Sequence, residues 1–137
     1  MVTNPPPAPP EPVIGRLSAI TLVTRDMAAA VRFYEALGFQ RKYGGPQAPF
    51  TSFEFGSSFL NLSAEAGSRG GPRPGWGRTI VYVSDVDAMY RKALAAGLTP
   101  EFAPSDAPWG ERYFHIVDPD GHELSLAKPL NQPPSPM

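Results

Sequence analysis

The stretch WGERYFHIVDPDGHELSLA, from Trp109 to Ala127, decides the fold. At its centre, Asp118-Pro119-Asp120-Gly121 places a turn-forming residue at every position. Asp suits the first position, Pro fixes φ at the second, and Gly accepts a left-handed conformation at the end. These residues predict a β-hairpin with a short loop, Pro119 to Gly121. Asp118 then faces His122, and the pairs further out are Val117–Glu123, Ile116–Leu124, His115–Ser125 and Phe114–Leu126.

This pairing gives the hairpin two different faces, because side chains alternate along a strand. One face is uniformly apolar and is predicted to be core: Phe114, Ile116, Leu124 and Leu126. The other face mixes polar and aromatic residues: Tyr113, His115, Val117, Glu123, Ser125 and Ala127. A face of this composition is either solvated or lines a cavity, and the function depends on which of the two it is.

Composition narrows the class of protein. A chain of 137 residues is one domain with room for a core, and a net charge of -1 gives no basic footprint for nucleic acid or an anionic membrane. The absence of cysteine excludes disulfides and thiolate metal sites. We find no membrane-spanning run and no signal peptide, so a cytoplasmic protein is expected. Residues 1–13 and 131–137 are rich in Pro and are predicted to be extended, poorly ordered tails.

The rest of the chain repeats one pattern twice. Asp26 and Asp85 are good helix N-caps, and Gly38 and Gly97 follow each helix by the same spacing. Each half reads β-α-β-β-β, and the Gly/Pro-rich residues 65–77 link the halves. The predicted strands are 16–24, 39–43, 50–55 and 58–63 in the first half (16–64) and 78–83, 101–103 and the hairpin in the second (78–130), with helices at 27–37 and 86–96.

Neither half alone covers its own sheet. We therefore predict a single α+β domain, 16–130, in which two βαβββ modules form curled mixed sheets around a shared cavity. By alternation, Leu60 and Leu62 point to the core, whereas Ser52, Glu54, Phe59 and Asn61 point the other way.

The repeat, the DPDG hairpin and an Asp-capped helix ending in FYEALGF (Phe33 to Phe39) together resemble the vicinal oxygen chelate superfamily. That superfamily holds glyoxalase I, extradiol dioxygenases, fosfomycin resistance enzymes and bleomycin resistance proteins. The resemblance covers roughly Leu17 to Leu130. Trp109-Gly110, an aromatic strand and then the DPDG turn are most similar to the bleomycin-resistance branch, which implies a homodimer with an aromatic-lined groove.

The resemblance also implies where a metal would be bound. Metal enzymes of the family carry His, Gln or Glu at four cavity-facing positions, which in this sequence are Ala19, Asn61, Arg78 and Ser125. None of these is a good ligand for a divalent metal, and a guanidinium repels one. We therefore expect no metal and no cofactor.

The resulting prediction is a metal-free protein that binds and sequesters an aromatic or antibiotic-like small molecule. Net charge and the cations Arg78 and Arg112 near the expected pocket argue against bleomycin itself, which is cationic. The predicted ligand-binding residues are Asn61, Arg78, Tyr82, Trp109, Tyr113, His115 and Ser125.

Several of these residues keep a second interpretation. His115 either bonds Ser125 or Tyr113 or acts as an acid–base group. Arg78 either holds an anionic ligand or pairs with Glu54 or Glu123. Tyr82 and Tyr113 line the cavity or pack at a dimer interface, Trp76 covers core or ligand, and His122 is expected to be a solvated turn residue. The alternative functions are a lyase or dioxygenase with displaced metal ligands, for example His115, Glu54 and Glu123, or a metal-free isomerase using His115.

Overall fold

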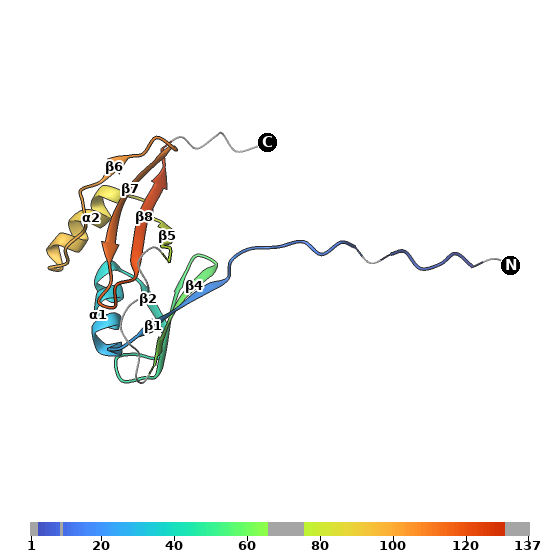
Figure 1. Cartoon of the computed structure of the whole chain (residues 1–137), viewed down its shortest axis with the longest axis horizontal. Coiled ribbons are helices and arrows are strands. Elements are labelled where there is room, and N and C mark those ends of the chain that lie inside the picture. Colours follow the sequence, from blue (N-terminus) through green and yellow to red (C-terminus); the bar gives the residue numbers. More distant parts are fainter. Residues whose placement is uncertain (1–2, 9, 66–75, 131–137) are drawn as a thin grey trace.

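The computed structural model of the chain describes residues 3–8, 10–65 and 76–130. The chain forms two four-stranded mixed sheets with one helix in each half (Figure 1). The first sheet has the order β1-β4-β3-β2 and the second β5-β8-β7-β6. No helix in these residues is long and apolar enough to cross a membrane. The elements are β1 (Ala19–Thr24), α1 (Met27–Leu37), β2 (Gln40–Tyr43), β3 (Phe50–Phe55), β4 (Ser58–Ala64), β5 (Thr79–Tyr82), α2 (Val86–Ala95), β6 (Ser105–Asp106), β7 (Glu111–Val117) and β8 (Glu123–Pro129).

The α+β architecture and the repeated β-α-β-β-β order confirm the predicted fold class. In each module the first strand pairs in parallel with the last one, β1 with β4 and β5 with β8. Helix α1 packs against β4, and α2 packs against β7 and β8, so each helix covers one face of its own sheet. The two sheets do not close into a barrel, which leaves the faces opposite the helices open in a single chain (Figure 1).

The helix boundaries follow from local chemistry. The Asp26 carboxylate accepts a hydrogen bond from the Ala29 amide at 3.1 Å, and Asp85 does the same for Ala88 at 3.0 Å. Each carboxylate satisfies an amide that the first helical turn leaves free. Gly38 ends α1 in the left-handed conformation, with φ of 105°.

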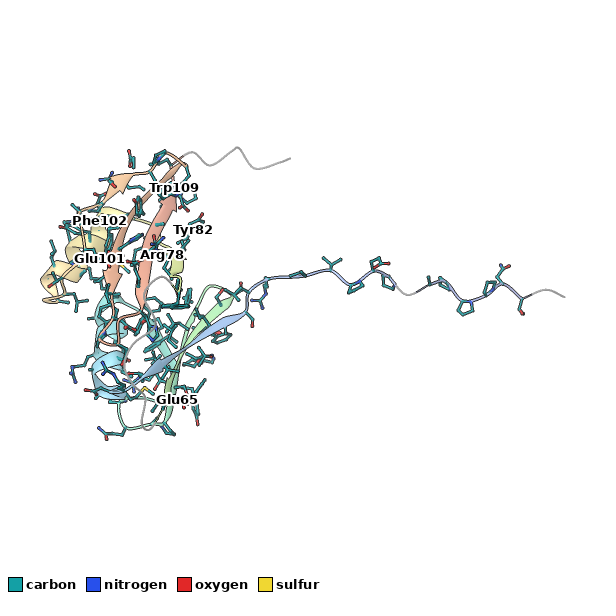
Figure 2. All side chains as sticks on the ribbon, viewed as in Figure 1. Glu65, Arg78, Tyr82, Glu101, Phe102 and Trp109 are labelled. Carbon is teal, nitrogen blue, oxygen red and sulfur yellow. The ribbon has the colours of Figure 1, made fainter. Side chains whose placement is uncertain are left out.

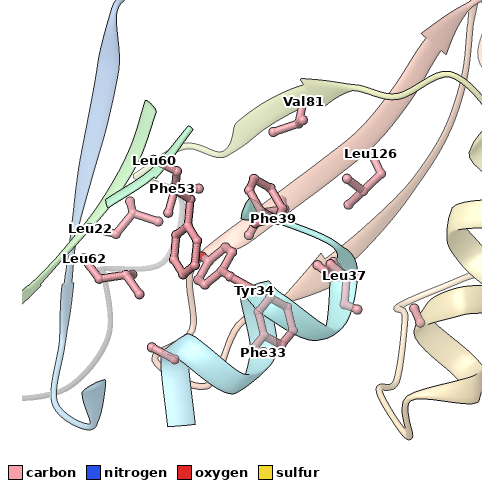
Figure 3. Packing of buried hydrophobic residues seen from close by; sticks show 14 of the residues in the cluster. Leu22, Phe33, Tyr34, Leu37, Phe39, Phe53, Leu60, Leu62, Val81 and Leu126 are labelled. Carbon is pink, nitrogen blue, oxygen red and sulfur yellow. The ribbon is translucent and has the colours of Figure 1, made fainter. Parts of the chain in front are cut away.

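The core forms where the α1 stripe meets both sheets. Tyr34, Leu37, Phe53 and Leu60 have no exposed surface. Figure 3 shows these residues in one cluster that also contains Val81 and Leu126, so the second module contributes to the same core. Burial of this cluster is the main force that holds the two modules together.

The DPDG turn makes a second, polar connection between the modules. The Tyr34 hydroxyl on α1 donates to the Asp118 carboxylate at 2.7 Å, and both groups are buried. Asp120 accepts from the Arg25 amide at 2.9 Å. His122 was expected to be solvated, and this is wrong: only 7 % of the residue is exposed, and its Nε2 lies 2.8 Å from the Val23 carbonyl oxygen. The side chains of Asp118, Asp120 and His122 are buried because the end of β1 and the start of α1 lie over them.

The strand predicted at residues 101–103 is also wrong. The edge strand is β6, at Ser105–Asp106, just after the predicted segment. Its position is explained by the pairing of Ser105 with Tyr113 and of Asp106 with Arg112, reinforced by a 2.8 Å bond from the Arg112 guanidinium to the Asp106 carboxylate. Glu101 makes a single ladder bond, from its amide to the His115 carbonyl at 2.8 Å.

Other boundaries differ slightly. The first strand begins at Ala19 rather than Arg16, and β2 begins at Gln40 because the Phe39 amide still bonds the Tyr34 carbonyl of α1 at 3.0 Å. Residues 3–8 and 10–18 have no regular secondary structure, and the chain before β1 projects away from the domain (Figure 1). Most of the predicted linker, residues 66–75, and the predicted tail 131–137 lie outside the described residues.

Candidate functional site

The hairpin has the register that the sequence predicts. The Asp118 amide donates to the His122 carbonyl at 2.9 Å and the Gly121 amide to the Asp118 carbonyl at 3.0 Å, which closes the three-residue loop. Val117 pairs with Glu123 and His115 with Ser125. The apolar face is core, as expected: the residues Phe114, Ile116, Leu124 and Leu126 are between 0 and 1 % exposed.

The opposite face carries a continuous row of rings, which we call the aromatic platform: Phe102, Trp109, Tyr113 and His115. The Tyr113 ring centroid lies 5.4 Å from that of Trp109, 5.1 Å from that of His115 and 5.4 Å from that of Phe102. The centroids of Phe102 and His115 are 5.1 Å apart. These spacings are typical of aromatic contact, so the rings hold one another in place.

Trp109 lies at the open end of the platform. Its side chain is oriented by a hydrogen bond from the indole N–H to the Glu111 carboxylate at 2.8 Å, yet 66 % of the residue is exposed. Tyr82, on the edge strand β5 of the same sheet, is 62 % exposed, and the nearby Glu111 raises the pKa of its hydroxyl. Figure 2 shows Trp109 and Tyr82 on the same side of the second module. An indole that is fixed but exposed is suited to receive a flat ligand.

A group of ionisable side chains adjoins the other end of the platform. His115 Nδ1 lies 3.9 Å from a Glu101 oxygen and 3.8 Å from a Glu123 oxygen. One potential ligand atom from each of these three residues lies within 4.8 Å of the others. The Arg78 guanidinium donates to Glu123 at 2.6 Å. We call Glu101, His115, Glu123 and Arg78 the ionisable cluster.

The cluster shifts the pKa of three of its groups. Partial burial raises the pKa of Glu101, and the hydrogen bond that it shares with Glu123 raises it further. The bond from Arg78 lowers the pKa of Glu123. Burial lowers the pKa of His115, and the nearby Arg78 adds to this, against the opposing effect of Glu123. The lowered pKa favours a neutral His115 imidazole at neutral pH.

The structure brings most of the predicted site residues together, but not all. Arg78, Tyr82, Trp109, Tyr113, His115 and Ser125 all lie in the second module, on β5, β7, β8 or the segments beside them.

Asn61 lies apart, on the first sheet. Its amide oxygen accepts from Ser52 at 2.7 Å and its amide nitrogen donates to Thr21 at 3.2 Å. Ser125 is only 5 % exposed and stands opposite His115 on the neighbouring strand. The hydrogen bond proposed from His115 to Ser125 or Tyr113 is not formed among the described residues, where His115 faces carboxylates instead.

One charged residue was placed wrongly, and a pairing that the sequence left open between two glutamates is decided. Arg112 was expected near the pocket, but it belongs to the helix-covered face, where its guanidinium donates to Asp87 and Asp106, each at 2.8 Å. Glu54 was considered as a partner of Arg78, whereas its carboxylate is 3.8 Å from Lys42 and Arg78 pairs with Glu123. The platform therefore carries less positive charge than the sequence indicated.

Sequence reasoning missed Glu101 and Phe102 as site residues. They follow α2 in a segment that was interpreted as a strand, and no periodicity marks them. Figure 2 shows both on the β7 side of the sheet, across from Arg78 and Tyr82. The amide of Glu101 bonds the His115 carbonyl, and this long-range bond brings the segment onto the platform.

The four positions at which the superfamily binds metal do not fit a metal ion here. The Asn61 amide is engaged by Ser52 and Thr21, and the Arg78 guanidinium bonds Glu123. Ala19 offers no donor atom, and the Ser125 hydroxyl alone is a weak ligand. These positions therefore provide no site for catalysis by a metal.

Comparison with known proteins identifies the family. The model of the Glyoxalase/Bleomycin resistance protein/Dioxygenase superfamily matches residues 16–126. This chain belongs to that superfamily, in agreement with the resemblance inferred from the DPDG hairpin and the repeat.

Solved structures of the superfamily have the same fold. A glyoxalase/bleomycin resistance protein/dioxygenase from Nocardioides is 26 % identical, with a TM-score of 0.63 over 91 % of this chain and 92 % of that one. A bleomycin-binding protein complexed with bleomycin is 26 % identical, with a TM-score of 0.67 over 87 % of this chain and all (100 %) of that one.

A curated relative, an uncharacterized protein of Mycobacterium bovis, is 46 % identical over 50 residues, which is 36 % of this chain and 33 % of that protein. The matched segment is thus about a third of the relative's length.

Proposed function

We propose that this protein binds a flat, partly apolar organic molecule on the aromatic platform and holds it without converting it. The observation that carries the proposal is the row of contacting rings that ends in an oriented but 66 % exposed Trp109. Folding has already ordered these rings on one face. A ligand that stacks on them therefore loses less affinity to the ordering of side chains.

The comparisons support binding as the activity. The bleomycin-binding protein has a matching fold over most of this chain, and its complex contains an organic antibiotic. The four metal positions lack suitable donors, which disfavours the metal-dependent reactions of the superfamily. Sequestration needs only the platform and the polar groups around it.

Substitution of Trp109 tests this proposal. Trp109→Ala is expected to weaken binding of three-ring aromatic probes by about 1–3 kcal/mol, roughly 5- to 150-fold, because it removes one stacking surface. Isothermal titration with proflavine and with 9-anthracenecarboxylate measures the change.

Trp76→Ala is the matched control, since the Trp76 ring contacts His122 and not the platform. Binding is expected to survive chelator treatment, and mass spectrometry should recover the probe unchanged. If neither probe binds, or if Trp109→Ala leaves the affinity for the probes unchanged, the platform is not the binding site.

The second candidate is a metal-free enzyme that uses His115 as an acid–base group. It is favoured by the two carboxylates within 3.9 Å of the imidazole and by burial, which lowers the pKa of His115 and leaves a neutral base at neutral pH. Turnover that is lost in His115→Gln while binding persists would establish this function.

A further inference from the structure

We infer that the ionisable cluster selects the charge of the ligand: Glu101 forms a subsite for a protonated nitrogen carried by a flat ring system. This inference rests on the proposed function, because it concerns the polar end of the same platform. It reverses the expectation from net charge, which argued against a cationic ligand.

The first step is the local charge of the platform. Three carboxylates adjoin it: Glu101 from the segment after α2, Glu111 from β7 and Glu123 from β8. Among the described residues, the Arg78 guanidinium bonds one of them, Glu123. Arg112 is bound by Asp87 and Asp106 on the other face of the sheet. The platform is therefore acidic, although the chain as a whole is almost neutral.

The second step is the closeness of Glu101 and Glu123. Carboxylate oxygens of Glu101 and Glu123 lie within 4.8 Å of each other, and two carboxylates this close repel unless a proton or a cation lies between them. Arg78 compensates Glu123, so Glu101 carries the unbalanced charge. The Glu101 side chain is 35 % exposed, which leaves it accessible to a ligand.

The third step is the connection between this carboxylate and the rings. Phe102 follows Glu101 directly, and its ring contacts both Tyr113 and His115. Uncharged His115 does not compete for the carboxylates as a cation would. A ring stacked on the platform that carries an amine or amidine at its edge therefore meets Glu101, and it gains a charge-assisted hydrogen bond there.

A divalent metal is the competing occupant of the same three side chains, since their ligand atoms lie within 4.8 Å of one another. The guanidinium at 2.6 Å from Glu123 argues against it, because a metal on that carboxylate would lie close to a fixed positive charge. A protonated nitrogen needs only Glu101 and leaves the Arg78–Glu123 pair intact.

The test compares two planar probes of similar size and opposite charge on the full chain. Proflavine is a cation at neutral pH, and 9-anthracenecarboxylate is an anion. The wild type is expected to bind proflavine at least about tenfold more tightly. Glu101→Gln should weaken proflavine about 5- to 20-fold, because a partly exposed charged hydrogen bond is lost, and should not weaken the anion.

The matched control is Glu54→Gln, an exposed glutamate on the first sheet, which should leave both affinities unchanged. The pH dependence gives a second readout. A raised pKa of Glu101 means that the wild type should lose proflavine affinity on acidification before ordinary carboxylates are protonated, and Glu101→Gln should lack this step. Arg78, Glu111, Glu123, His115, Tyr82 and Tyr113 are the other titratable groups at this face and are unchanged in the variant.

Four results would overturn the inference. If the wild type does not distinguish the two probes, or if Glu101→Gln has no effect while Trp109→Ala abolishes binding, the platform binds without a cation subsite and only the proposed function stands. If neither probe binds, both fail. One equivalent of Zn²⁺ that displaces proflavine and is lost in Glu101→Gln would assign the cluster to a metal.

Discussion

At the scale of single residues, the DPDG turn buries two carboxylates, those of Asp118 and Asp120. Burial raises the pKa of Asp118, while the bond from Tyr34 and those from the His122 and Asp120 amides lower it. Asp118 is only 4 % exposed, so each donor matters. An ionised carboxylate in this environment is tolerated because several donors replace the water that it loses.

Tyr34→Phe tests this account. The substitution leaves Asp118 with one oxygen buried and without its hydroxyl donor, so the free energy of unfolding should fall by about 1–3 kcal/mol. Urea denaturation followed by circular dichroism measures it. Tyr90→Phe is the control, because that ring packs on Phe114 and should change stability by less than about 0.5 kcal/mol. Equal effects of the two substitutions would show that the Tyr34–Asp118 bond contributes nothing.

At the scale of elements, local chemistry predicts most of what the structure shows. Both helix caps, the end of α1 at Gly38 and the hairpin register depend on residues within a few positions of one another, and sequence reasoning placed them well. Strand β6 depends on Arg112 reaching Asp106, and the site residue Glu101 depends on a bond to His115; neither contact is visible in a local pattern. Asn61 was grouped with the site because the resemblance assigns cavity-facing positions along the sequence. It does not say which faces of the two sheets lie together in one chain.

The repeated caps give a matched pair of substitutions. Asp26→Ala and Asp85→Ala each remove a carboxylate that accepts an amide hydrogen bond at the start of a helix. Each should lower the free energy of unfolding by about 1 kcal/mol, and Asn at either position should restore most of it. Thermal and urea denaturation provide the measurement. An Asn variant as unstable as the Ala variant would mean that the cap is not the cause.

At the scale of the whole molecule, one chain leaves an incomplete site. Ile80, Tyr82 and Trp109 are between 57 and 66 % exposed on the uncovered face of the second sheet. Monomeric proteins seldom expose a large contiguous apolar patch. A second copy of the chain could bury this patch in a symmetric interface. We therefore propose a homodimer in which the partner supplies the missing wall of the ligand site.

Light scattering should give twice the chain mass of 14.8 kDa at micromolar concentration. Ile80→Lys should shift the protein towards monomer, because it buries a charge in the proposed interface. Leu94→Lys, at a 48 % exposed position on α2, should not. A wild type that stays monomeric at this concentration contradicts the proposal.

The DPDG turn also means that the two halves of this duplicated chain are no longer interchangeable. The corresponding hairpin of the first half turns through Gly56 and Ser57, and this turn contains no carboxylate. Only the second half supplies Asp118, Asp120 and His122 to the end of β1 and the start of α1. A tandem copy of the first half would therefore lack partners for the Tyr34 hydroxyl, the Arg25 amide and the Val23 carbonyl. The two repeats therefore have different structural roles, because the turn of the second repeat supports the start of the helix in the first.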